Sequence, residues 1–522
     1  MKKIIALILS LMLVISIIAA CTSEADQQAT GDEPATADTD TDIDTDTDTD
    51  TGTDEEGESR EGNEPSEDTV VDMERADHLT IALNSGGLTA ATVESAYINF
   101  FESYTALTGT VIEPIFMPGG ADYRAWLTTQ HAAGTTPDIF AIMLSQVWED
   151  YATGLVVDLT DFLQEENPYN PGMPWIDTFD QSLLEQTVDP ISGKFVSVMR
   201  ELVAVRIIYN RDIFTSAGVT ETPTTWEEFL QVCRQIQDAG YTPFAFAVQA
   251  GSGHSNWFLT SLFGQLDAPL RAIMDVDGDG FVSKNELARA TVEGLIDYSE
   301  DPFRTGFELF RDFSQYWNSD FNAIDMEMAQ QLWLMGQASM LALHSADLLA
   351  VYQMEGRDFE FGSFSFPMVT PETTPLADSG LVTMLGGAAN ESWAISVNAA
   401  ESEARLNSAV DLLRYLSSHY FVDMVVNELM MMPVINDVQL REELQGFIKQ
   451  DFEDIRRANY TGPATLSEFS HYIIMALQLY LPGTISFEEF TESLNREWTE
   501  GMLRDMEAAG WTEENNFGIE MP

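Results

Sequence analysis

Short apolar runs alternate with helix-like stretches from residue 79 onward, and this alternation constrains the fold more than any other feature. Leu79–Leu83 is an apolar run that ends in a polar, glycine-rich turn, and a helical pattern follows over 91–107. Further strands are predicted at 111–116 and 137–142, with a helix at 122–132 between them. Because strands separated by helices pair in parallel, we expect βαβ units and an α/β fold.

The N-terminus has the pattern of an export signal. Lys2 and Lys3 precede an apolar run of 17 residues, Ile4 to Ala20, which is short for a membrane-spanning helix. The run ends at Cys21 in a sequence that resembles the lipobox of bacterial lipoproteins, whose cysteine carries a diacylglycerol. We therefore expect 1–20 to be a lipoprotein signal peptide and Cys21 to anchor the chain to the outside of the cell membrane. The alternative is an ordinary signal peptide followed by a chance cysteine.

Residues 21–75 are predicted to be a disordered tether and not a domain. Between Thr22 and Glu74 there are 21 acidic residues and one basic residue, and Asp alternates with Thr over much of the stretch. Such a segment buries too little apolar surface to offset its chain entropy, and charge repulsion extends it. The alternative interpretation is weak calcium binding by the Asp repeat.

The overall charge excludes nucleic acid as a partner. Lys and Arg number 24 against 86 Asp and Glu, which gives a net charge of −62. A surface this acidic repels phosphate backbones, and it suits a neutral or cationic ligand better than a polyanion unless the binding cleft is locally basic. Two cysteines exclude a disulfide-stapled scaffold, and no two of the six histidines have a zinc-ligand spacing.

Several short motifs of the body occur in the order found in one known family. They are Pro137–Phe140, Tyr151–Leu159, Tyr209–Phe214, Pro223–Phe229, Gly336–Met340 and Trp393–Ser396. Together they resemble the family-1 extracellular solute-binding proteins, the sugar-type binding proteins of ABC importers that are related to maltose-binding protein. The resemblance covers about 77–515. It implies a type II periplasmic-binding-protein fold, in which two hinge-linked α/β lobes with mixed sheets enclose a ligand cleft.

The same resemblance implies domain limits and a function. The N-lobe would comprise 76–203 plus 340–388, and the C-lobe 204–339 plus 389–522. A monomer would capture a carbohydrate or similar small solute and deliver it to the transmembrane subunits of an ABC permease, without bond chemistry. Two other classes stay open: a surface enzyme that acts on polysaccharides, and a calcium-dependent adhesin or interaction protein. The G-x-S-x-G, phosphate-loop and H-E-x-x-H motifs are absent, so no catalytic residue is predicted.

Candidate ligand-binding residues lie at loop positions that match the family. Sugars present apolar ring faces and rims of hydroxyls, which aromatic and planar polar side chains recognise. The candidates are Asn84, Ser85, Asp122, Tyr123, Ser145 and Gln146 in the N-lobe, Arg200 and Glu201 at the first crossing, and His254, Trp257, His344, Ser345 and Trp393 farther along. Each could instead serve packing, and Arg200 could pair with Glu201. Many relatives carry a tryptophan where this chain has Ala346, so one expected stacking face is missing.

The sharpest motif is an EF-hand-like loop at 275–286. It fits D-x-D-x-D-G-x5-E at every constrained position, and hard oxygen ligands in that order suit Ca²⁺. The predicted ligands are Asp275, Asp277, Asp279, the Phe281 carbonyl, Ser283 through water, and Glu286. Because sensor EF-hands usually pair and only one loop is present, we expect one structural calcium site. The alternative is an acidic surface loop that binds no metal.

Overall fold

The computed structural model describes residues 64–66, 69–85, 90–118, 121–184, 187–189, 192–249, 253–353, 357–377, 380–454, 458–461 and 467–519. They belong to one compact unit, Glu61–Pro522. The predicted signal peptide, Cys21 and the predicted tether as far as residue 63 lie outside the described residues. Within the described ranges, no helix is both long and apolar enough to cross a bilayer.

The first half of the unit is built from βαβ units, as the sequence predicts. The strands β1 (His78–Asn84), β2 (Val111–Met117) and β3 (Ile139–Met143) pair in parallel in the order β2-β1-β3. The connecting helices are α2 (Ala90–Thr108) and α3 (Ala121–Ala133). Asp138, directly before β3, accepts hydrogen bonds from the Thr80 N–H (2.8 Å) and hydroxyl (2.9 Å), which fixes β3 against β1. Shorter elements follow: α4 (Leu144–Ala152), α5 (Thr160–Leu163), η2 (Trp175–Thr178) and α6 (Gln181–Leu184).

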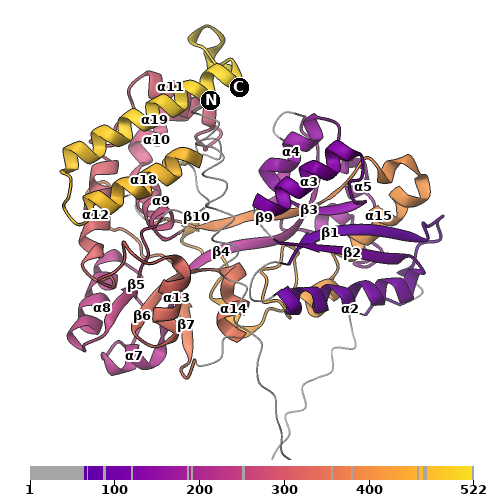
Figure 1. The fold of residues 1–522 in the computed structure, drawn as a ribbon, viewed down its shortest axis with the longest axis horizontal. Coiled ribbons are helices and arrows are strands. Elements are labelled where there is room, and N and C mark those ends of the chain that lie inside the picture. The colour runs from indigo at the N-terminus through magenta and orange to yellow at the C-terminus, as the bar shows by residue number, and fades with distance from the viewer. Residues whose placement is uncertain are drawn as a thin grey trace, which may run out of the picture. The chain divides into compact units, whose positions relative to one another are not determined.

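One long strand, β4 (Val198–Asn210), joins this half to the second (Figure 1). Its residues up to Ala204 pair with β9 (Gly386–Ile395), which also pairs with β3. From Val205 onward it pairs with β6 (Ala338–His344) and β7 (Phe361–Phe364), and β5 (Thr242–Ala245) continues the sheet beside β6. The result is a mixed sheet in the order β2-β1-β3-β9-β4-β6-β5, which confirms the predicted α/β class.

Helices of the second half pack around an aromatic-rich core. Helix α8 begins after Thr225, whose side chain forms the predicted capping box with Glu228. Phe229, Phe244 and Phe313 pack together in this core with ring centroids 5.0–6.2 Å apart. The helices before β6 are α7 (Arg211–Ser216), α8 (Trp226–Asp238), α9 (His254–Leu266), α10 (Ala268–Met274), α11 (Lys284–Val292), α12 (Phe303–Ser314) and α13 (Met326–Leu334). The elements after β6 are η4 (Ser345–Asp347), α14 (Leu348–Gln353), β8 (Val382–Thr383), η5 (Ala399–Glu401), α15 (Glu403–Tyr415), α16 (His419–Phe421), η6 (Val422–Val426), α17 (Glu442–Gln445), β10 (Glu453–Asp454), α18 (Ser467–Tyr480), α19 (Phe487–Ala509) and η7 (Glu513–Gly518).

The later chain contributes strands and helices to both parts of the sheet. The range 340–388 was expected in the N-lobe, yet β6 and β7 pair with the second part of β4. The range 389–522 was expected in the C-lobe, yet β9 and α15 pack with β1, β3 and α2, and only the chain from about 452 returns to the second core. The reason is the antiparallel insertion of β9 between β3 and β4, a long-range pairing that no local pattern records.

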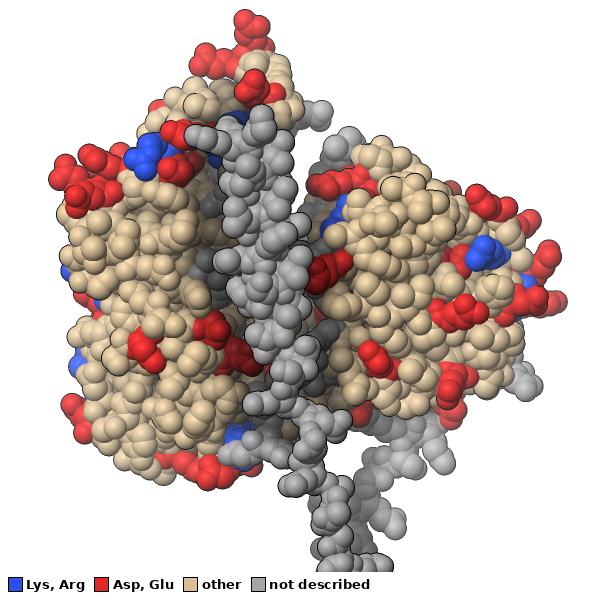
Figure 2. Space-filling model, viewed as in Figure 1, with Lys and Arg blue, Asp and Glu red and all other residues tan. Residues whose placement is uncertain are grey.

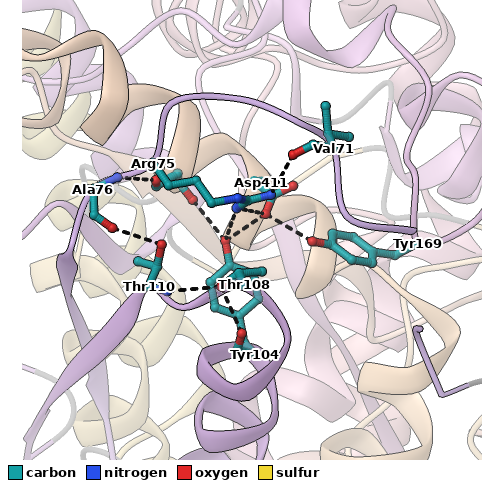
Figure 3. A network of polar contacts seen from close by, with 9 residues as sticks. Val71, Arg75, Ala76, Tyr104, Thr108, Thr110, Tyr169 and Asp411 are labelled. Carbon is teal, nitrogen blue, oxygen red and sulfur yellow. Dashed lines mark hydrogen bonds and ion pairs between the residues drawn. The ribbon is translucent and has the colours of Figure 1, made fainter. Parts of the chain in front are cut away.

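The chain immediately before β1 is fastened to the first half by a polar network (Figure 3). Arg75 donates to the buried Asp411 of α15 over 2.7 Å, and the hydroxyls of Tyr104 and Tyr169 donate to the same carboxylate oxygen over 2.7 and 3.0 Å. The Ala76 N–H donates to Ser408 over 2.9 Å. Thus the point at which the predicted tether meets the body is fixed to α2 and α15.

A second buried arginine holds the late chain against β4. Arg206 is fully buried and donates to the carbonyls of Gly446, Phe447 and Ile448 over 3.0–3.1 Å. It also pairs with the buried carboxylate of Glu453 over 2.9 Å. Because the guanidinium and the Glu453 carboxylate are both buried, loss of the guanidinium would leave Glu453 charged and unpaired.

We therefore predict that Arg206→Met lowers the free energy of unfolding by about 3–5 kcal/mol, the usual effect of breaking a buried ion pair. Lys194→Met is the matched control, because the Lys194–Asp158 pair is 42% and 36% exposed, and it should cost less than about 1 kcal/mol. Urea denaturation of both variants measures the difference. Equal destabilisation by the two substitutions would contradict this account.

Candidate functional site

A cluster of polar and aromatic side chains lies where β4 passes from one half to the other. Its centre is the buried Arg200, whose Nε donates to the Tyr97 hydroxyl over 3.1 Å and whose Nη1 pairs with Glu391. The guanidinium carbon also lies 5.2 Å from the ring centroid of Trp393 and 5.5 Å from that of Tyr97. Burial lowers the pKa of Arg200, but the neighbouring Tyr97 and Glu391 more than offset this, so its net pKa is raised and it stays charged. We name this the crossing cluster; its members are Asn84, Tyr97, Arg200, Glu201, Glu391 and Trp393.

Glu391 joins two of the predicted residues. The Asn84 side-chain amide at the end of β1 donates to one oxygen of Glu391 over 2.5 Å, while Arg200 binds the other oxygen. Glu391 is not among the residues predicted from the sequence. The signal was present, since Glu391 lies two residues before Trp393 on one strand and therefore on the same face of the sheet.

Glu201 sits beside this pair without a partner of its own. It is half-buried and stands opposite Glu391 in the β4–β9 ladder. The register of that ladder shifts three times between Met199 and Ala204, and such bulges re-aim side chains. Within the described part of the chain, the Glu201 carboxylate makes no hydrogen bond or ion pair. Burial raises the pKa of Glu201 to about 7, with Arg200 opposing and Glu391 reinforcing the shift.

A second group lies next along β4. Trp257 and His344 face each other with ring centroids 6.3 Å apart and an interplanar angle of 13°. Burial lowers the pKa of His344 to about 4, so its ring is neutral at pH 7. The Ser345 hydroxyl accepts a hydrogen bond from the Ala204 N–H over 3.2 Å. Since Ala204 follows Glu201 by three residues, this contact is roughly 10 Å along the strand from the crossing cluster.

Two of the predicted ligand-binding side chains are buried in this structure. Trp393 is 1% exposed, because it packs between Arg200 and the edge of Tyr97, and it offers no open ring face. His254 is completely buried, and its two ring nitrogens bond to the backbone of Ala247 and Ala342. Burial lowers the pKa of His254 to about 4. Both side chains therefore contact other parts of the protein, and neither is open to a solute.

Among the side chains that the structure describes, the other four N-lobe candidates make no hydrogen bond to the crossing cluster. Ser85 is buried and donates to Glu94 over 2.9 Å, and the buried Tyr123 hydroxyl donates to the Ala82 carbonyl over 3.2 Å. Of the others, Asp122 is exposed in the first turn of α3, Gln146 is half-buried on α4, and the Ser145 side chain lies outside what the structure describes.

The EF-hand-like loop connects α10 to α11. Asp275 accepts hydrogen bonds from the N–H groups of Gly278 (2.8 Å) and Gly280 (3.1 Å), and both glycines have positive φ. Glu286 is fully buried and accepts from the Val276 N–H over 2.7 Å and from the Ser283 N–H over 2.8 Å. The loop therefore folds around its own carboxylates.

The donor set fits a calcium-sized cation. Asp275, Asp277 and Glu286 each offer an oxygen within 4.8 Å of the others. Because Ca–O distances are about 2.3–2.6 Å, oxygens on opposite sides of one ion are about 5 Å apart. Asp279 lies outside this trio, and its carboxylate accepts from the Phe281 N–H over 2.8 Å. Ser283 caps α11. The structure thus brings together three of the six predicted ligands.

A two-part α/β unit with a polar cluster on the strand shared by its halves is the architecture of a solute-binding protein. The family model of bacterial extracellular solute-binding proteins matches residues 90–419, and the chain belongs to that family. The family and its fold are those of binding proteins rather than of enzymes, and the family is extracytoplasmic.

Solved structures share the fold. A chitin oligosaccharide binding protein superposes with a TM-score of 0.59 at 18% identity, over 82% of this chain and 99% of that protein. The cyclic alpha-maltosyl-1,6-maltose binding protein from Arthrobacter globiformis gives the same TM-score and identity, over 81% and 98%. The erythritol/L-threitol-binding protein of Mycolicibacterium smegmatis is 24% identical over 171 residues. That match spans 31% of this chain and only 35% of the relative.

The raised pKa of Glu201 predicts how the folding stability of the protein changes with pH. The folded carboxyl keeps its proton up to about pH 7, whereas the unfolded one loses it near pH 4.5. The stability that this group contributes is therefore present below pH 4.5 and lost as the pH rises to about 7. We predict that Glu201→Gln gains stability relative to wild type as the pH rises from 5 to 8, on the order of 1–3 kcal/mol.

Calorimetric melting of both proteins at the two pH values measures this gain. Glu327→Gln, which removes a carboxylate from the exposed first turn of α13, is the control and should track wild type at both pH values. A stability gap for Glu201→Gln that stays constant or narrows toward pH 8 would refute the prediction.

Proposed function

We propose that this chain captures a small carbohydrate between its two halves and delivers it to the membrane subunits of an ABC importer. The observation that carries the proposal is the half-buried, unpartnered Glu201 on the strand that both halves share. The rings of Trp257 and His344, which face each other, lie farther along the same strand, where His344 pairs with Val205. Hydroxyls donate to carboxylates, and sugar ring faces stack on such rings.

The names of the similar proteins support this solute class. The structural neighbours bind chitin oligosaccharides and a cyclic maltosyl-maltose, and the sequence relative binds erythritol and L-threitol. All of these solutes carry rows of hydroxyl groups. A solute that contacts both halves favours their closed arrangement, because only differential affinity shifts such an equilibrium.

The N-terminal sequence supports a lipid anchor at Cys21. The apolar run Ile4–Ala20 and the lipobox-like sequence before Cys21 would leave the acylated thiol at the membrane, and the acidic stretch that follows would hold the body away from it. In this proposal the protein acts as a monomer and makes or breaks no bond in its solute.

Binding is tested by melting and titration against a panel of mono- and oligosaccharides. We expect at least one saccharide to raise the melting temperature and to bind one to one in calorimetry. At a concentration one hundred times its Kd, such a ligand adds about 2.7 kcal/mol to the free energy of unfolding. Trp257→Ala should weaken that binding at least tenfold. Trp511→Ala, a half-buried tryptophan outside the crossing cluster, should not. A panel that yields no shift and no heat would reject a carbohydrate as the solute.

We also propose that the 275–286 loop binds one structural Ca²⁺. The trio of oxygens within 4.8 Å and the D-x-D-x-D-G order support it. Calcium should raise the melting temperature of the wild type, EGTA should reverse the rise, and Glu286→Gln should remove it. Glu293→Gln, an exposed position that directly follows α11, should keep the full response. A wild type that ignores calcium, or a Glu286→Gln variant that responds fully, would disprove the site.

A further inference from the structure

We propose that Glu201 sets the charge class of the solute: the crossing cluster admits uncharged or cationic saccharides and discriminates against acidic ones such as uronates. This inference rests on the proposed function, because it concerns the same site. It goes beyond that function by assigning a selective role to one residue.

Arg200, the only cation of the crossing cluster, is already paired with Glu391. Arg200 is buried, and its charge is bound by Glu391 and covered by the rings of Tyr97 and Trp393. A solute carboxylate could reach this guanidinium only by displacing Glu391 from a buried ion pair, which would leave that carboxylate unpaired. Arg200 therefore organises the cluster and does not attract anions.

The carboxylates of the cluster outnumber its cation. The Glu391 carboxylate already forms an ion pair with Arg200 and accepts a hydrogen bond from the Asn84 amide. Glu201 pairs with neither of these groups, and none of the described residues donates a hydrogen bond to its carboxylate. With one guanidinium against two carboxyl groups, the ionised cluster carries a net charge of −1. Above about pH 7, where the half-buried Glu201 ionises, this negative charge resides on Glu201, because Glu391 is neutralised by Arg200.

The neighbouring group does not offset this charge. His344 is uncharged at pH 7 because burial lowers its pKa to about 4, and Trp257 and Ser345 are neutral. Hydroxyl groups of a neutral sugar can donate to Glu201, and an ammonium group can pair with it. A uronate placed at the same point meets like charge in a partly dry site, where repulsion is stronger than in water. The face of the molecule shown in Figure 2 carries far more acidic than basic side chains, and the net charge of the chain is −62, so the field of the whole protein also disfavours anions.

The irregular ladder explains why Glu201 can play this part. In a regular strand neighbours point to opposite faces, so Glu201 would turn away from Arg200. The three register shifts between Met199 and Ala204 break that alternation at this point. The bulged strand leaves Glu201 half-buried beside the ion pair and not fully covered by the ladder.

The test measures binding of matched saccharides to the full chain by calorimetry at pH 7.5. The probes are neutral disaccharides (maltose, xylobiose, N,N′-diacetylchitobiose), one uronate (digalacturonate) and one amino sugar (the glucosamine disaccharide). We expect a neutral or amino disaccharide to bind at least tenfold more tightly than digalacturonate. Glu201→Gln should shrink that ratio by roughly tenfold, whereas Glu327→Gln should leave it unchanged. The discrimination should also weaken in 1 M NaCl, where charge repulsion is screened.

The outcomes separate the two proposals. Digalacturonate binding as tightly as the neutral sugars, or an unchanged ratio in a folded Glu201→Gln protein, would overturn the selective role of Glu201 and leave the carbohydrate function intact. No binding of any saccharide would overturn the proposed function, and this inference with it. Melting of Glu201→Gln at the same pH shows whether the variant is folded.

Discussion

The two halves depend on one strand, β4, whose hydrogen-bonding partner changes between Ala204 and Val205. Up to that point it belongs to the sheet of β1, β3 and β9, and beyond it to the sheet of β5, β6 and β7. Arg200 is buried just before the change, and burial of a charge is costly unless it is paired and hydrogen-bonded. Glu391 of β9 and Tyr97 of α2 meet that requirement. The same residues therefore stabilise the strand where it passes between the halves and form the polar cluster.

Local structure could be read from the sequence because its signals are local. The strand-helix alternation at 79–142 and the capping box at Thr225 each depend on residues a few positions apart. The return of β9 to the first half could not be read, because its pairing with β3 joins residues about 250 apart in the chain. The predicted lobe limits after residue 339 therefore had no local signal to rest on.

Only part of the crossing cluster could be predicted, because some of its members come together through long-range pairing. Asn84, Arg200 and Glu201 were named from family-matched positions, and the fold does bring them together. The interpretation that Arg200 pairs with Glu201 failed because the ladder supplies Glu391 to Arg200 instead. Residue type alone could not show that Trp393 and His254 are buried, since exposure depends on which elements cover them.

The most direct test of the account is a crystal structure of the protein with a saccharide that binds in calorimetry. The account predicts that the sugar lies between the halves, with a hydroxyl within hydrogen-bonding distance of the Glu201 carboxyl group and a ring face against Trp257. A sugar held by one half alone, or bound at the separate cavity beside Tyr209, Tyr352 and Phe361, would contradict it.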